Sequence, residues 1–67
     1  EDFKAWSQHS GEEFLYVLKG SITVLYGLDK FVLNAGESIY YDSVVEHLVT
    51  SAGNEPAQVL AVVYTPN

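Results

Sequence analysis

The sequence predicts an all-β domain, either a sandwich or a barrel of short strands. Turn signals recur at short and regular intervals along the chain, at residues 10–11, 20–21, 27–29, 34–36 and 53–56. Between them lie runs rich in Val, Ile, Leu, Tyr, Phe and Thr, which suit a pleated and half-buried surface. Since several short strands without intervening helical segments are typical of all-β folds, we expect strands at residues 3–7, 13–18, 22–26, 30–33, 38–41, 47–50 and 58–64.

The expected strands are apolar on both faces. Successive side chains of a strand point to opposite sides. In the last strand both alternating sets are apolar, Val59, Ala61 and Val63 against Leu60, Val62 and Tyr64. A strand buried on one side alternates apolar with polar residues, so these strands need cover on both sides. A symmetric partner or a flanking segment of a longer chain would supply it, and we expect a homodimer.

The length of 67 residues allows one domain, which we place at 1–67. Hydrophobic residues make up 48% of the chain and charged residues 18%, which predicts a folded domain. Cysteine is absent, so neither disulfides nor thiolate metal sites stabilise it. The chain begins without an initiator methionine and contains no methionine, and we therefore expect it to be part of a longer gene product.

The charge balance excludes one class of function. Nine acidic residues against three basic ones give a net charge of −6. An acidic surface repels phosphate backbones, so we expect this segment to make no contact with nucleic acid. No apolar run approaches the roughly 20 residues that span a bilayer, and no secretory signal is present. We expect no membrane association and a cytoplasmic location.

Three residues form a candidate metal site. His9 and Glu13 flank the turn at residues 10–11, and His47 begins a later strand. Two imidazoles and a carboxylate that converge would hold Fe, Mn, Ni or Zn and leave coordination positions open. The alternative is a hydrogen-bonded polar cluster that holds no metal, and the spacing of the residues does not decide between the two.

Two sequence blocks resemble the motifs of the cupin superfamily. The block from His9 to Gly20 (HSGEEFLYVLKG) is similar to the first motif, in which a histidine is followed by a glutamate and, further on, by a glycine. Residues 35–42 (AGESIYYD), followed by His47, are similar to the second motif. The resemblance implies a cupin double-stranded β-helix, or jelly-roll barrel, with its pocket at His9, Glu13 and His47.

The chain departs from the cupin motifs at four positions. Metal-binding cupins have His-x-His at the start of the first motif, and the earlier histidine falls on Ser7 here. One of four family ligands is therefore absent, and three remain. The prolines usual before the glycine and before the final histidine of the second motif are Ala35 and Glu46, and an asparagine found in some cupins falls on Ser51.

The first motif and the C-terminal residues 59–66 also resemble the sensor half of bacterial helix-turn-helix (XRE-type) transcriptional regulators. This resemblance implies a dimeric cupin domain that binds a small-molecule effector, with the DNA-binding domain outside this chain. The alternative is a metal-dependent cupin enzyme, a dioxygenase or isomerase, with Tyr41 or Glu46 as general acid or base. A third possibility is a sugar- or polyketide-binding module without turnover.

Further expectations concern the pocket and the aromatic residues. We predict that Ser7, Tyr41 and Val49 line the ligand pocket. Aromatic side chains are usually buried in cores and interfaces, so we expect core and dimer packing for the aromatic set Trp6, Phe14, Tyr16, Tyr40 and Tyr41.

Overall fold

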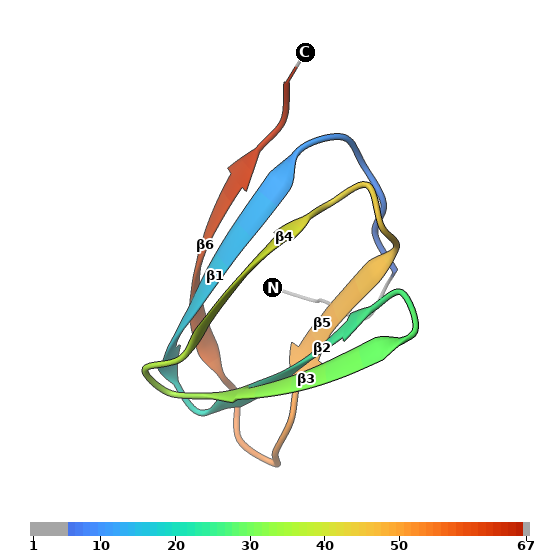
Figure 1. Cartoon of the computed structure of the whole chain (residues 1–67). Helices are drawn as coiled ribbons and strands as arrows, with labels where there is room; N and C mark the ends of the chain where they lie inside the picture. Colours follow the sequence, from blue (N-terminus) through green and yellow to red (C-terminus); the bar gives the residue numbers. More distant parts are fainter. Residues whose placement is uncertain (1–5, 67) are drawn as a thin grey trace.

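A computed structural model describes residues 6–66. It contains six strands, β1 (Glu12–Lys19), β2 (Ser21–Tyr26), β3 (Asp29–Asn34), β4 (Ser38–Asp42), β5 (His47–Ser51) and β6 (Gln58–Tyr64). They form two antiparallel sheets with the orders β4-β1-β6 and β3-β2-β5 (Figure 1). β1 and β2 are consecutive in sequence but belong to different sheets, so the chain crosses from one layer to the other at once. The expected all-β fold is confirmed.

The strand bounds agree closely with those expected from turn signals. β6 matches at both ends, and the other five strands each extend by one residue at one or both ends. Most of the strand expected at 3–7 lies outside the described residues. Within them, Ser7 forms an isolated antiparallel bridge with His47.

The core lies between the two sheets and follows the alternation of the strands. Its buried hydrophobic residues are Leu15, Val17, Ile22, Val24, Leu33, Tyr41 and Val49. Leu15 and Val17 of β1 are two residues apart, as are Ile22 and Val24 of β2, so each strand turns one face inward. Full burial of each such side chain stabilises the fold by about 1.5–3 kcal/mol.

Of the aromatic set expected in core and dimer packing, one member lies in the core of the single chain and three lie outside it. Trp6, Tyr16 and Tyr40 are 47%, 36% and 65% exposed, whereas Tyr41 is buried. Alternation explains the difference, because Tyr16 and Tyr40 lie on the outer face of the β4-β1-β6 sheet. No second layer of the described residues covers that face.

β6 is exposed along almost its whole length. Ala61 and Val63 pair with Leu15 and Glu13 and so belong to the inner face, but both are exposed. Val62, on the outer face, is exposed as well. The apolar character of both faces, noted in the sequence, therefore corresponds to a strand that the described residues leave uncovered on both sides.

Gly11 fixes the approach to β1. Its φ of +118° lies in a region that other residues rarely adopt, and a Cβ there would collide with the carbonyl oxygen of Tyr64 at the end of β6. Only glycine fits this contact, which places the segment between His9 and Glu13. Among the described residues, no helix is long and apolar enough to cross a membrane.

Candidate metal centre

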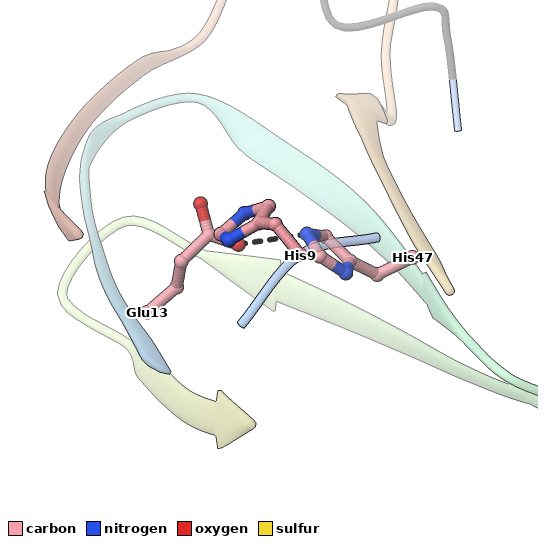
Figure 2. Close-up of side chains that lie close together, drawn as sticks. All are labelled: His9, Glu13 and His47. Atoms are coloured by element: carbon pink, nitrogen blue, oxygen red, sulfur yellow. Dashed lines mark ion pairs between the residues drawn. The ribbon is translucent and has the colours of Figure 1, made fainter. Parts of the chain in front are cut away.

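The structure brings the three candidate ligands together. His9 lies in the segment before β1, Glu13 is the second residue of β1, and His47 is the first residue of β5. One potential ligand atom from each residue lies within 4.8 Å of the others. Figure 2 shows the three side chains pointing toward one another, with the imidazole centroids 5.6 Å apart. The convergence that sequence spacing left open is therefore present.

Backbone hydrogen bonds hold the two histidine segments in register. Ser7 and His47 exchange two backbone bonds, of 2.8 and 2.9 Å. The His9 amide donates to the carbonyl of Ser43 at 3.0 Å, and the Ser43 amide donates to the carbonyl of Gly11 at 2.9 Å. Residues 7–11 are thus tied to residues 43–47, and the positions of both imidazoles follow from this pairing.

The hydrogen bonds of His47 define which of its nitrogens is free. Nδ1 lies 2.7 Å from the carbonyl oxygen of Val45. A carbonyl oxygen only accepts, so Nδ1 carries a proton and donates it. In the neutral imidazole, Nε2 then carries a lone pair, as a metal ligand requires.

The free Nε2 of His47 faces a carboxylate oxygen. Glu13 Oε1 lies 2.8 Å from Nε2, as the dashed line in Figure 2 marks, and this pair is largely buried. Oε1 finds no donor when His47 is neutral. Two lone pairs at this distance need a cation between or beside them, either a proton on Nε2 or a metal ion. The site is therefore built to hold a positive charge.

His9 repeats the arrangement of His47. Its Nδ1 lies 3.1 Å from the carbonyl oxygen of Ser10, so Nδ1 again donates and Nε2 is left free. Backbone carbonyls that bond to the second nitrogen are the usual means of orienting metal-bound histidines. The donor set is two imidazole nitrogens and one carboxylate oxygen, which fits a divalent transition metal and leaves coordination positions open.

Tyr41 and Tyr26 form the wall beside the cluster. Tyr41 pairs with Glu13 across β4 and β1, and its ring centroid is 5.0 Å from that of His47 and 5.3 Å from that of Tyr26. Burial raises the pKa of Tyr41 well above its usual value near 10, and the neighbouring Glu13 carboxylate raises it further. The hydroxyl therefore stays protonated, and it has no hydrogen-bond partner among the described residues. It can donate a hydrogen bond to a bound molecule.

The remaining predicted residues lie at different distances from the cluster. Ser7 is exposed, but since it opposes His47 in the bridge, both side chains lie on the same face. Val49 is buried in the core next to Val24. Glu46 is exposed, and its backbone carbonyl accepts a bond from Gly27.

Sequence reasoning missed two residues of this region. Tyr26 pairs with His47 in the ladder of β2 and β5 and faces the same way. Its position two residues after Val24, on the inward side of β2, is a signal that alternation alone contains. Ser43 is fully buried and holds the His9 segment through its backbone, and no pattern in the sequence marks it.

The structure combines two antiparallel sheets with a cluster of two histidines and one glutamate that could hold a metal ion. Residues 1–63 match the family described as "Cupin domain". The chain belongs to this family, as the two motifs suggested.

Solved structures of one enzyme are similar to the chain. A structure of FeII HppE in complex with substrate is 35% identical, with a TM-score of 0.80 over 90% of this chain and 36% of that one. Hydroxypropylphosphonic acid epoxidase from S. wedmorenis in complex with fosfomycin is 33% identical, with a TM-score of 0.80 over 90% and 35%. The chain thus spans about a third of the length of these relatives. No curated protein matches it.

Proposed function

We propose that this chain is an iron-binding cupin domain that holds Fe(II) through His9, Glu13 and His47. The observation that carries the proposal is the convergence of three potential ligands, since one potential ligand atom from each residue lies within 4.8 Å of the others and Glu13 Oε1 lies 2.8 Å from His47 Nε2. The likeness to a structure of FeII HppE supports iron over the other divalent metals. When bound with open positions, such an ion supplies redox chemistry with oxygen and substrate.

For the longer protein we propose an oxidative enzyme that acts on a small organic molecule. The support is the 33–35% identity to an epoxidase whose structures contain substrate or fosfomycin, over about nine-tenths of this chain. In this chain Tyr41 is the residue placed to donate a hydrogen bond beside the metal, because its buried hydroxyl has no other partner among the described residues.

The second candidate is the sensor domain of a cytoplasmic helix-turn-helix regulator. Its support is the resemblance of residues 9–20 and 59–66 to such sensors, together with the net charge of −6, which disfavours DNA contact by this segment itself. The two candidates differ in turnover. An enzyme consumes oxygen and substrate together, whereas a sensor binds its effector and releases it unchanged.

Fe(II) binding tests the proposal directly. Anaerobic titration of metal-free protein with Fe(II), followed by removal of free metal and iron analysis, should give one iron per chain. Replacement of His47 by alanine should abolish this uptake, and Gln8→Ala, in the same segment but hydrogen-bonded to the exposed Val44, should not change it. Wild-type protein without stoichiometric iron would sink the proposal.

We further propose that two copies of the domain pack through the outer face of the β4-β1-β6 sheet. The apolar residues of this face are Phe14, Tyr16, Leu18, Tyr40, Leu60 and Val62. Glu12 and Asp42 are paired at one end of β1, and Lys19 stands at the other. An antiparallel arrangement of two copies would bring the lysine of each near the carboxylates of the other, which favours a second copy as the occupant.

Sedimentation velocity tests this pairing. Wild-type protein should sediment as a dimer at micromolar concentration, and Leu60→Asp should shift it to a monomer. Leu28→Asp is the control, since Leu28 is fully exposed in the turn between β2 and β3, away from this face. A compact wild-type monomer would refute the arrangement.

A further inference from the structure

A cavity opens between the edge strands β3 and β4, and Tyr41 is among its lining residues. β3 is the last strand of one sheet and β4 the last strand of the other. The cavity has a volume of about 800 Å³, which lies in the range of small-molecule pockets. Its lining includes Tyr26, Phe31, Leu33, Ile39 and Tyr41.

The position of Phe31 shows that the described residues, 6–66, do not fill this space. Phe31 pairs with Val24, and Leu33, two residues later, pairs with Ile22, so the phenylalanine faces the core side of the sheet. Its neighbours on that face are buried, but Phe31 is 43% exposed. An inward-facing aromatic ring that remains nearly half exposed borders an opening between the sheets.

Tyr41 borders both the cavity and the candidate metal centre. Its side chain lines the cavity, and its ring lies beside that of His47. The residue is only 6% exposed, and its hydroxyl makes no hydrogen bond of normal geometry with the described residues, although the Glu13 carboxylate lies near enough to raise its pKa. Buried hydroxyls are normally hydrogen-bonded, so this group is available to donate to an acceptor that enters the cavity.

The lining determines the chemistry of the occupant. Tyr26, Phe31 and Tyr41 provide three aromatic rings, which favour a flat, unsaturated molecule. The rim carries one cation and one anion, Lys30 and Glu37, which balance each other. Since the whole chain carries a net charge of −6, an uncharged ligand is favoured over an anion.

We propose that the cleft between β3 and β4 binds an uncharged planar aromatic molecule whose acceptor oxygen bonds to the Tyr41 hydroxyl. The inference rests on the proposed small-molecule binding of this domain but not on its metal. A bound molecule would lie with its rings against Phe31 and Tyr26 and its oxygen beside the iron site.

Two matched probes test the proposal on metal-free protein kept in EDTA. The probes are 2-acetylnaphthalene, an aryl ketone, and 2-ethylnaphthalene, which has the same shape without the oxygen. Amide chemical shifts in ¹⁵N-labelled protein should change in β3 and β4 with both probes. The ketone should bind more tightly, and Tyr41→Phe should weaken the ketone by about three- to tenfold while leaving the ethyl compound unchanged.

A second variant distinguishes weaker binding in the cleft from loss of the fold. Phe31 is already 43% exposed, so Phe31→Ala should preserve the amide spectrum and weaken both probes by about tenfold. Leu28→Ala, in the exposed turn that precedes β3, should change neither affinity.

Three results would overturn the cleft proposal. They are shifts confined to the outer face of the β4-β1-β6 sheet, equal affinity of Tyr41→Phe for the ketone, and absence of shifts in β3 and β4 because another copy or segment fills the cleft. Because the titration contains no metal, its outcome is independent of iron binding. If the protein binds iron but not the ketone, the cleft proposal is refuted and the proposed function stands. If it binds the ketone but not iron, the proposed function is refuted and the cleft proposal stands.

Discussion

Replacement of Glu13 by glutamine should change metal binding and metal-free stability in opposite directions. The substitution keeps the size of the side chain and removes its negative charge. Glu12 provides the matched control, because it is the preceding residue of β1 and its carboxylate accepts a bond from the exposed Tyr40 hydroxyl on the outer face. Glu12→Gln therefore makes the same chemical change outside the site.

The loss of iron affinity can be bounded from the role of Glu13 in the donor set. Removal of partners that only orient a metal ligand typically costs 10–100-fold in affinity. Glu13 supplies the one carboxylate of the cluster, so its loss should cost at least the upper end of that range. We expect about 100-fold weaker Fe(II) binding, or about 2.8 kcal/mol, since each tenfold change corresponds to about 1.4 kcal/mol.

The stability of the metal-free protein should rise or stay constant. In metal-free wild-type protein held at a pH where Nε2 of His47 carries no proton, Oε1 of Glu13 faces the lone pair of that nitrogen at 2.8 Å without a donor. The amide of glutamine can turn its NH₂ group toward that nitrogen and donate a hydrogen bond. Such a bond contributes about 1 kcal/mol, so the variant should unfold at the same temperature as the wild type or at a higher one.

The assay combines anaerobic calorimetric titration with Fe(II) and thermal unfolding in EDTA, followed by circular dichroism. Wild type and Glu12→Gln should bind iron alike, while Glu13→Gln should bind it weakly. Iron affinity of Glu13→Gln within threefold of wild type would refute the assignment of the ligand. A metal-free Glu13→Gln protein less stable by more than about 1 kcal/mol would refute the reasoning about opposed lone pairs.

Three further predictions concern the fold. Gly11→Ala should lower the free energy of unfolding by about 1–3 kcal/mol, because its φ is +118° and a Cβ would collide with the backbone at the end of β6. Gly53→Ala is the control in thermal unfolding and should be nearly neutral, because a Cβ there meets open space. Leu15→Ala, in the core, should cost about 2–5 kcal/mol, and Leu28→Ala, fully exposed in the turn between β2 and β3, should cost far less; equal losses would contradict the assigned core. Because burial raises the pKa of Tyr41, the unfolded chain releases that proton first as pH rises above about 10, so stability in urea should fall with pH there, and less steeply in Tyr41→Phe.

Local patterns in the sequence account for most of the fold. Turn residues and β-branched runs placed all six strands to within one residue at each end. Alternation identified both apolar faces of the last strand, and the structure leaves those faces exposed. Aromatic character alone did not separate core residues from outer-face residues, because it says nothing about which face a residue occupies. Tyr40 and Tyr41 are adjacent, yet one is 65% exposed and the other 6%.

The candidate site was predictable in its residues but not in its geometry. Residue chemistry and motif resemblance selected His9, Glu13 and His47, and the fold brings them within ligand distance of one another. In His9 and His47, Nε2 is free because Nδ1 donates to a backbone carbonyl. The positions of these carbonyls depend on the backbone path of the loops, which no pattern of side chains predicts. The cleft between β3 and β4 could not be predicted from the sequence either, because it arises from how the edges of two sheets lie relative to each other.

A metal at this site would also support the fold, because its ligands come from both sheets. Glu13 belongs to the β4-β1-β6 sheet and His47 to the β3-β2-β5 sheet, so one ion would tie the two layers together. Seven hydrophobic residues are buried among residues 6–66, and domains with a small core commonly need such a link. Binding at about 100 times the dissociation constant adds about 2.7 kcal/mol, comparable to one large core side chain. Ser7, which opposes His47 on the same face, is too short to be a fourth strong ligand, so the ion would keep the open positions that chemistry or effector binding requires.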